Sequence, residues 1–388
     1  MKLAKRVSDI AESVTLEITS KAKSMAKKGI DVVNFAAGEP DCDTPMHIKA
    51  AAMEAIRSGF TKYTPSSGMP ELREAIVKKL KKDNSLDYCA AQIIVSNGAK
   101  HSLNNIFQVL CEEGDEVMIP SPYWLSYPAM VKMAEAKPVF VPASSENNFK
   151  VTEKSIAAKI TKRTRCMVLN SPANPTGSVY SLEELKFIAK LAAAYNFFVI
   201  SDEIYEKLIY DNVKHISIAS LGKDICDRTI TINGLSKSYS MTGWRIGYAA
   251  GPAEVMKAAA NLQSHAASNA SSISQKAALA AITGDQGCVE DMRIEFQKRR
   301  DAMVSGIGAM GKISCTKPEG AFYALCDISK LNISSVVCAN RLLDEARVAV
   351  IPGEPFGDNA VIRLSFATGM SEIKKGLDRI GDWVKKNG

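Results

Sequence analysis

Hydrophobic residues between positions 91 and 250 fall into short runs, and each run ends in a polar or glycine-rich turn. Segments with the spacing of an amphipathic helix separate the runs. Short apolar runs that alternate with helices are typical of parallel strands buried on both faces of a sheet. The pattern therefore predicts an α/β fold with a mostly parallel sheet. The runs, each with its following turn, are QIIVSNGAK, EVMIPSPYW, RCMVLNSPANPTG, FFVISDEIYEKL, RTITINGLSKSYS and RIGYAAGP.

Further helices and a second α/β unit are predicted outside this region. A helix is predicted over residues 46–58, and Pro70 opens another in the first turn, where proline is tolerated. A polar helical pattern from 252 to about 310 precedes GAFYALCDI, SSVVCANRLLDEA, VAVIPGEPFG, AVIRLSFA and a closing helix. We expect an N-terminal segment, 1–45, that joins the small domain, a large domain, 46–285, and a small C-terminal domain, 286–388.

Composition narrows the functional classes. Of the 388 residues, 46% are hydrophobic and 23% are charged, as in ordinary globular proteins. No run approaches about 18 consecutive apolar residues, so we expect no membrane span. The net charge of +7 is spread along the chain, which favours a solvated surface over nucleic-acid binding and also suits anionic metabolites. The N-terminus lacks the apolar core of a signal peptide, so we expect a cytoplasmic protein.

Cysteines, histidines and one glycine motif argue against other kinds of site. The nine cysteines stand singly without a C-x-x-C pair, which indicates free thiols in a reducing compartment. The four histidines are far apart in the sequence, so we expect no metal site. GIGAMG, residues 306–311, fits G-x-G-x-x-G, but a predicted helix precedes it and a strand follows it, the reverse of a dinucleotide-binding fold. A helix that ends in glycine is the better interpretation.

Polar residues follow several predicted strands. Parallel sheets bind ligands beyond the carboxyl ends of their strands. Residues 97–100, Asn174, Asp202 and Lys237 should therefore line one crevice. Lys237 has the most specific chemistry, because a lysine that is buried beside a cation has a lowered pKa and is nucleophilic near neutral pH. Arg245 could be that cation or could hold a phosphate, whereas a lone lysine after a strand is usually solvated.

The neighbours of Lys237 decide between these interpretations, although each has an ordinary alternative. SNGAKHSL leads from a strand through glycine into a helix, which aims backbone N–H groups at an anion. Trp124 suits stacking on a planar ring or packing in the core, and Asn174 lies in a tight turn. Asp202 ends an apolar strand and needs a cation or strong donors, with Tyr205 near the same place. Together with the lysine they form the set that pyridoxal 5′-phosphate (PLP) requires.

Eight segments in this order make the chain resemble the class I aminotransferases of PLP fold type I, and most of all the prokaryotic-type aspartate aminotransferases. The segments are AAGEPDCDTP, YTPSSGMPELREAI, SNGAK, PSPYWLSYP, NSPANPTG, SDEIY, SKSYSMTGWRIGY and VIRLSFA. The resemblance covers nearly the whole chain. It implies a large PLP-binding domain with a mostly parallel seven-stranded sheet flanked by helices, and a smaller α/β domain.

The resemblance also implies roles for single residues. The catalytic ones are Lys237, which forms the Schiff base with PLP, Asp202, which pairs with the pyridine nitrogen, and Tyr205. The cofactor is held in addition by Gly98, Ala99, Lys100, Trp124, Asn174, Ser236, Arg245 and, from the partner subunit of a homodimer, Tyr63. The substrate is bound by Gly38, Trp124, Asn174, Arg363, Lys100, Ser13 and Thr15. The family often has a serine in the place of Gly234, so that phosphate contact is lost unless Ser236 replaces it.

A cation at Lys100 favours a dicarboxylic substrate, although this residue could also be an ordinary helix-start lysine. The resemblance therefore implies an enzyme that moves the amino group of L-aspartate or L-glutamate to a 2-oxo acid such as 2-oxoglutarate in a ping-pong reaction. A prephenate or aromatic aminotransferase, a carbon–sulfur β-lyase and a decarboxylase on the same fold are alternatives that the sequence leaves open.

Overall fold

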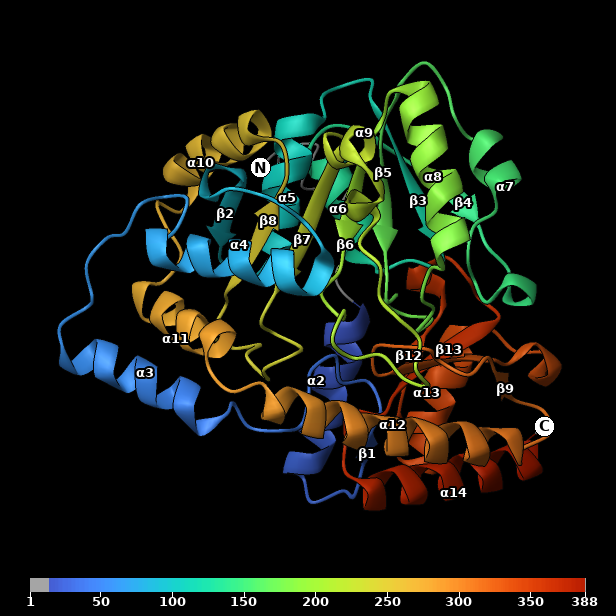
Figure 1. The fold of residues 1–388 in the computed structure, drawn as a ribbon. Helices are drawn as coiled ribbons and strands as arrows, with labels where there is room; N and C mark the ends of the chain where they lie inside the picture. The colour runs from blue at the N-terminus through green and yellow to red at the C-terminus, as the bar shows by residue number, and fades with distance from the viewer. Residues whose placement is uncertain (1–13, 388) are drawn as a thin grey trace, which may run out of the picture.

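The largest sheet has seven strands and contains most of the apolar runs. The structure, a computed structural model, describes residues 14–387. β8 is antiparallel to both its neighbours, and the other neighbouring pairs are parallel. The predicted mostly parallel seven-stranded sheet is confirmed. In spatial order its strands are β2 (Ile93–Ser96), β8 (Gly247–Ala250), β7 (Thr229–Gly234), β6 (Phe198–Asp202), β5 (Thr164–Asn170), β3 (Glu116–Ser121) and β4 (Lys137–Pro142) (Figure 1).

Helices cover both faces of this sheet, which explains the wholly apolar strands. One face packs against α5 (Ala99–Leu110), α6 (Ser126–Met133) and α10 (Ala253–Ala266). The other packs against α7 (Glu153–Ala157), α8 (Leu182–Tyr195), η3 (Ile218–Leu221) and α9 (Lys223–Cys226). At the β2 end lie α3 (Met46–Arg57), α4 (Pro70–Asn84), η1 (Ala90–Gln92) and α11 (Ser272–Thr283), and η2 (Ser145–Asn147) follows β4. Successive strand residues alternate between the faces, so Ile200 of β6 contacts the first layer and Val199 the second.

One edge of the sheet gathers the segments that were predicted to line a crevice. β2 is antiparallel to β8, which is antiparallel to β7, so β2 ends at the same edge as β7. Gly247 pairs with both Ser96 and Gly234, which brings the turns after β2 and β7 together on either side of β8. Asp202 ends the next strand, β6. Residues far apart in the chain thus meet at the carboxyl edge, as the sequence predicts.

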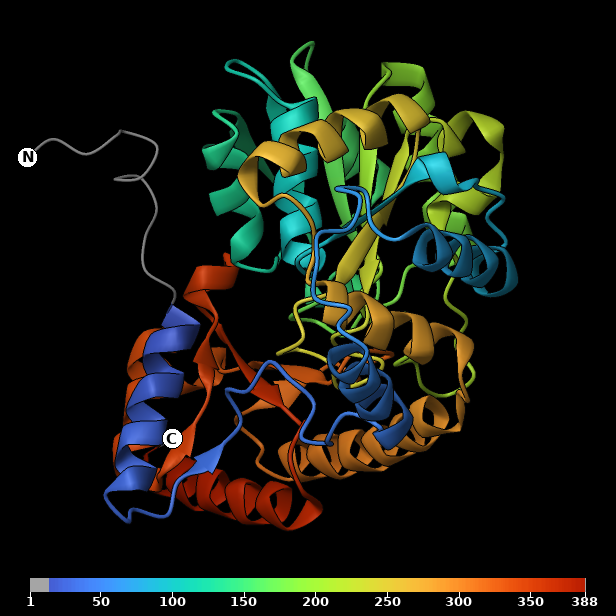
Figure 2. The ribbon, with the colours of Figure 1, turned by 90° about the vertical axis from the view of Figure 1, so that its left-hand side faces the viewer.

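Both ends of the described chain contribute to a smaller unit (Figures 1 and 2). Its antiparallel sheet has the order β12 (Ile351–Pro352), β13 (Val361–Ser365), β10 (Tyr323–Asp327) and β9 (Ser314–Cys315), and β1 (Val33–Asn34) pairs in parallel with β11 (Val348–Ala349). Its helices are α2 (Val14–Lys27), α12 (Gly287–Gly308), η4 (Ser329–Leu331), α13 (Ser335–Ala346), η5 (Glu354–Phe356) and α14 (Met370–Asn387). Both views show α2 beside the C-terminal elements. The domain boundaries at 45/46 and 285/286 stay predictions.

Some of the single helices and strands are predicted from the sequence, and others are not. The helix that starts at Pro70 and the glycine-rich end of α12 are confirmed, and β9 follows GIGAMG. The sequence analysis does not predict β4 (KPVFVP), an edge strand with two prolines in which Val141 is the one buried residue. The run VAVIP divides between β11 and β12, which belong to different sheets. Within residues 14–387, no helix is long and apolar enough to cross a membrane.

Candidate active site

Lys237 lies just beyond β7 at the carboxyl edge. Its Nζ donates a hydrogen bond to the carbonyl oxygen of Gly38, in the loop after β1, and lies 5.8 Å from the centre of the Tyr205 ring. Burial lowers the pKa of Lys237 to about 8, and the cations Arg363 and Arg245 add to this shift. A lysine with this pKa has an unprotonated fraction near neutral pH, which a nucleophilic amine needs.

Asp202 is almost fully buried at the end of β6, and no lysine or arginine forms an ion pair with it among the described residues. Its Oδ2 accepts a 2.7 Å hydrogen bond from the Tyr127 hydroxyl of α6, and its Oδ1 accepts one of 3.3 Å from the backbone N–H of Ile204. Burial raises the pKa of Asp202 to about 6 despite these donors. The carboxylate therefore has no cationic partner in the described part of the protein, which leaves it available to a protonated pyridine nitrogen. Sequence reasoning missed Tyr127, which looks like any apolar-face tyrosine of a helix.

The start of α5 and Arg245 form an anion cradle. Gly98 has φ 88°, and a Cβ on it would lie 2.6 Å from Nη2 of Arg245. The same Nη2 donates to the carbonyl oxygen of Asn97, 3.4 Å away. A Cβ on Gly247 would lie 2.3 Å from the backbone nitrogen of Ala99, so glycine is needed on both sides of this turn. Free N–H groups at the helix start and a guanidinium beside them suit a phosphate.

Lys100 and Trp124 lie next to this cradle. The ammonium nitrogen of Lys100 is 4.8 Å from the centre of the Trp124 indole, and burial, with Arg245, lowers the pKa of Lys100. The indole meets the ring of Tyr127 edge to face, with 5.2 Å between the ring centres. Tyr127 also contacts Asp202, so the indole, the phenol and the carboxylate are neighbours. This arrangement is compatible with a planar ring above Asp202, and the stacking role of Trp124 stays a prediction.

Arg363 of β13 is a buried cation that has no carboxylate partner among the described residues. Its Nη1 donates to Oδ1 of Asn174 and its Nη2 to the carbonyl oxygen of Ala36, both at 3.1 Å, while Nε has no hydrogen-bond partner. The guanidinium lies over the Tyr323 ring, 4.3 Å from its centre, and is 2% exposed. Burial lowers the pKa of Arg363. A buried guanidinium that meets only neutral groups is costly and fits an anionic ligand.

Tyr323 of β10 links Arg363 to Tyr205 and was missed by the sequence analysis. Its hydroxyl lies 2.9 Å from that of Tyr205, and burial raises the pKa of both phenols. A Cβ on Gly38 would lie 3.6 Å from the same hydroxyl, an ordinary van der Waals distance, so the loop of Gly38 lies against Tyr323. In the sequence, GAFYALCDI has the pattern of an ordinary buried strand, and nothing in it marks the tyrosine.

For four of the predicted site residues, the structure describes no contact with the side chains around Lys237. Tyr63 is 88% exposed, and its reach into a partner's site stays a prediction. Ser13 lies outside the described residues, and for Thr15 only its position in α2 is described. Ser236 is buried, and its phosphate contact stays a prediction. A Cβ on Gly234 would lie 3.1 Å from the Cα of Gly247, so a serine there would crowd β8.

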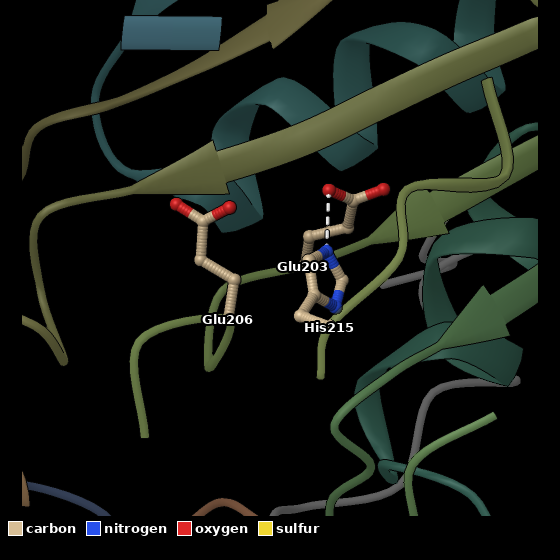
Figure 3. A group of neighbouring side chains, drawn as sticks. All are labelled: Glu203, Glu206 and His215. Carbon is tan, nitrogen blue, oxygen red and sulfur yellow. Dashed lines mark hydrogen bonds and ion pairs between the residues drawn. The ribbon is translucent and has the colours of Figure 1, made fainter. Parts of the chain in front are cut away.

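A second polar cluster lies behind the first (Figure 3). Oxygen and nitrogen atoms of Glu203, Glu206 and His215 lie within 4.8 Å of one another, a spacing that a metal ion could use. However, the ammonium group of Lys79 contacts Glu206, and Asn84 donates to both carboxylates. A lysine already supplies positive charge here and protein donors occupy the carboxylate oxygens, so the cluster is a hydrogen-bonded network rather than a metal centre.

The donor set at the carboxyl edge fits PLP. Lys237 offers an amine with a lowered pKa, Asp202 a carboxylate without a cation, and Gly98 a cradle that no larger residue would leave open. Nε of Arg363 has no partner in the described part of the chain, and Nη1 and Nη2 donate once each and keep a second N–H, so the guanidinium has donors left for a substrate carboxylate.

Comparison with protein families gives the same result. Residues 30–380 match the model of the aminotransferases of class I and II. An aspartate aminotransferase of Bacillus sp. (strain YM-2) is 49% identical, and the alignment covers 99% of both chains. An aspartate/prephenate aminotransferase of Nitrosomonas europaea is 43% identical over 98% of this chain and 99% of its own.

Solved structures agree in fold. The aspartate aminotransferase of Thermus thermophilus with maleate has a TM-score of 0.95 at 42% identity, covering 98% of this chain and 99% of its own. That of Rhizobium meliloti has a TM-score of 0.96 at 39% identity and covers all of both chains. The strand order, the site chemistry and the sequence thus agree.

Proposed function

The chain belongs to the class I and II aminotransferases, and we propose that it moves the amino group of L-aspartate or L-glutamate to a 2-oxo acid such as 2-oxoglutarate. It is a PLP-dependent transaminase, as this family membership establishes. PLP supplies an electron-withdrawing ring that stabilises negative charge at the substrate Cα.

We assign the holding of PLP to the groups at the carboxyl edge. Lys237 is the residue to bond its aldehyde, and Asp202 is the partner of its ring nitrogen. The N–H groups of Ala99 and Lys100 and the Arg245 guanidinium hold its phosphate, with Trp124 against the ring. The N–H of Gly98 already donates to the carbonyl oxygen of Ser96, at 2.8 Å. Asn174 and Tyr205 hydrogen-bond its ring oxygen. The supporting observation is that these side chains come from separate strands but face one small region.

Lys237 is also the group that moves a proton in the reaction. When it is not bonded to the cofactor, Nζ would be a free amine whose pKa of about 8 suits both uptake and delivery of a proton near neutral pH. The buried surroundings of Tyr205 and Phe322 exclude water from this amine. Nζ would therefore act as base by taking the proton from the substrate Cα, and then as acid by delivering that proton to the aldehyde carbon (C4′) of PLP.

The observation that carries the choice of substrate is a group of three cations. Arg363 holds the α-carboxylate bidentately, Arg245 faces the phosphate, and Lys100 remains for a second carboxylate. Lys100 is exposed and has no carboxylate partner among the described residues, so its ammonium group is available to a ligand that brings a carboxylate. Ser13 and Thr15 are proposed as further contacts of that carboxylate.

Prephenate is a second candidate acceptor. It carries two carboxylates, which the same cations could bind, and relatives at 43 to 46% identity are named aspartate/prephenate aminotransferases. The first half-reaction with aspartate is the same for both candidates.

The assembly and the cell compartment belong to the same proposal. A homodimer in which Tyr63 reaches the partner's phosphate accounts for its 88% exposure and for the exposed apolar side chains of Met46, Met53 and Ile56 on the neighbouring α3. Nine free cysteines are consistent with a reducing, cytoplasmic location.

The visible absorption spectrum of the purified holoenzyme tests this function. Titration with L-aspartate and L-glutamate should bleach the band of the lysine-bound cofactor, and L-alanine and L-phenylalanine should have little effect. Addition of 2-oxoglutarate, oxaloacetate or prephenate to the aspartate-treated enzyme should then restore the band and rank the acceptors. Bleaching by phenylalanine alone would contradict the role of Lys100, and ammonia with pyruvate as products would indicate a lyase.

A further inference from the structure

The turn after β6 presents different residues to the two sides of the sheet. Asp202 and Tyr205 face the cofactor region, where they contact Tyr127 and Tyr323. Glu203 and Glu206 point the other way, because strand residues alternate and the turn continues this separation. Glu203 is 0% exposed, yet the reaction as derived above does not use it. A fully buried carboxylate without a role in the chemistry needs another explanation.

Glu203 is satisfied by four donors from three parts of the chain. Its Oε1 accepts from the hydroxyls of Ser201, at 2.9 Å, and Ser217, at 2.7 Å. Its Oε2 accepts from Nε2 of His215 at 2.9 Å and from Nδ2 of Asn84 at 3.3 Å (Figure 3). These contacts tie the end of β6 to the segment before η3 and to the end of α4.

Glu206 extends this network on the same side. Its Oε1 contacts the ammonium group of Lys79, and its Oε2 accepts from Asn84 at 2.7 Å. Lys79 donates to Oδ1 of Asn84 at 2.7 Å, so the amide is fixed in one orientation between the two glutamates. Beside this network, Asp83 forms an ion pair with Lys207 at 2.8 Å, and the pair adds no net charge to the surroundings of Glu206. The turn is therefore held from the far side of the sheet at Glu203 and Glu206, which directly follow Asp202 and Tyr205 in the sequence.

We propose that Glu203 is a positioning residue of the active site, which holds the turn so that Asp202 and Tyr205 meet the ring nitrogen and the ring oxygen of PLP. This rests on the proposed roles of Asp202 and Tyr205. A misplacement of about 1 Å in such a contact can cost about 10²-fold in rate. Arg363, which binds the substrate, lies on β13 and shares no direct contact with Glu203. Among the described residues it is linked to Tyr205 only through Tyr323, so substrate affinity should change less than the rate.

Glu203→Gln tests the proposal, because an amide cannot accept from Ser201, Ser217, His215 and Asn84 at once. The readout is the pH midpoint at which the visible band of the holoenzyme changes. A hydroxyl that donates to the ring oxygen favours its anionic form, so a displaced Tyr205 should raise the midpoint by about half a pH unit or more. We expect kcat to fall at least about tenfold while the KM for aspartate stays nearly constant.

Glu116→Gln is the matched control. Glu116 is also buried, at 3% exposed, and also bound by several donors, but it lies at the start of β3, at the opposite end of the sheet. It should lower the melting temperature and leave the spectral midpoint unchanged. Ser217→Ala removes one donor from Glu203 and should shift the midpoint in the same direction by less, which keeps the test valid if Glu203→Gln does not fold.

An unchanged midpoint and kcat in the folded variants, with only a lower melting temperature, would overturn the proposal and leave the aminotransferase function intact. A wild-type protein that binds no PLP and shows no visible band would overturn both.

Discussion

Two buried carboxylates at opposite ends of the same sheet have opposite surroundings. Glu116, where β3 begins, and Asp202, where β6 ends, are each 3% exposed. Glu116 accepts from Thr161 at 2.7 Å, Arg163 at 3.0 Å and Lys137 at 3.3 Å, and the Thr161 hydrogen bond with these cations lowers the pKa of Glu116. Asp202 meets only a phenol and a backbone N–H, and burial raises the pKa of Asp202 to about 6.

The difference separates charges that stabilise the fold from charges kept for a ligand. At the amino edge, folding itself supplies the counter-charges. At the carboxyl edge, burial shifts the pKa of Asp202 upward and the pKa values of Lys237 and Arg363 downward, so each shift disfavours the charged form. Such a group of ionisable side chains with shifted pKa values is typical of a functional site, and a ligand with complementary charges offsets the free-energy cost of burying their charges.

Removal of the amine should have the largest effect. Lys237→Ala should lower kcat with aspartate and 2-oxoglutarate on the order of 10⁴-fold, because no other group at that place can take the Cα proton. A coupled assay of oxaloacetate release measures it. The matched control is Lys150→Ala, since Lys150 is similarly buried but pairs with Glu184 at 2.9 Å, away from the site. Near-normal turnover of the Lys237 variant would refute its role.

Removal of the negative charge of Asp202 should have the second-largest effect. Asp202→Asn keeps the size of the side chain, and its oxygen can still accept from Ile204 while the Tyr127 hydroxyl turns to accept from the amide. The uncharged amide cannot hold a proton on a ring nitrogen, so kcat should fall about 10³-fold. Steady-state kinetics with saturating PLP distinguishes this from weaker cofactor binding. The fold should not suffer, because an uncharged amide is easier to bury than the carboxylate. A variant that unfolds at lower temperature but keeps its kcat would mean that Asp202, like Glu116, stabilises the fold and is not kept for a ligand.

The stability of the cofactor-free protein should depend on pH in opposite ways at the two edges. The pKa of Asp202 rises from 3.8 in the unfolded chain to about 6, so its favourable contribution is complete below 3.8 and is lost as pH rises to about 6, by ~3 kcal/mol. The lowered pKa of Glu116 gives a contribution that is present above 4.5 and is lost as pH falls through its folded pKa. Urea unfolding of wild type, Asp202→Asn and Glu116→Gln from about pH 2.5 to 8 measures both. Parallel pH curves for the three proteins would contradict the account.

Glu116→Gln should have the smallest effect at neutral pH. Arg163 and Lys137 have side chains that are 64% and 67% exposed and can regain water, so the free energy of unfolding should fall by roughly 1 kcal/mol. Turnover should not change. Thermal unfolding and kcat on the same preparation check this, and a large loss of activity would mean that the two edges are coupled.

The sequence reveals the residues of the site that follow strands and misses those that reach it through packing. Asp202, Lys237 and the glycine turn at Gly98 each stand at the end of an apolar run, and strand order brings them together. Tyr127 and Tyr323 lie within a helix and a strand, where their spacing is that of core residues. The partners of Glu203 come from α4 and the segment before η3, and no local pattern links them.

The same distinction applies to the fold. The buried central strands are predicted because both of their faces are apolar. β4 (KPVFVP) is an edge strand, and its lysine and two prolines interrupt the apolar run that marks a central strand. The short strands β11 and β12 are separated by a single residue, and only tertiary pairing assigns them to different sheets.

The most direct test of the central claim is to find which lysine bonds PLP. Borohydride reduction of the holoenzyme, followed by proteolysis and mass spectrometry, fixes the cofactor to the amine that holds it. The account predicts a single modified peptide that contains Lys237, the buried amine with a pKa of about 8. Modification at Lys100 instead, or no modified peptide after saturation with PLP, would contradict the assignment of the carboxyl edge as the catalytic site.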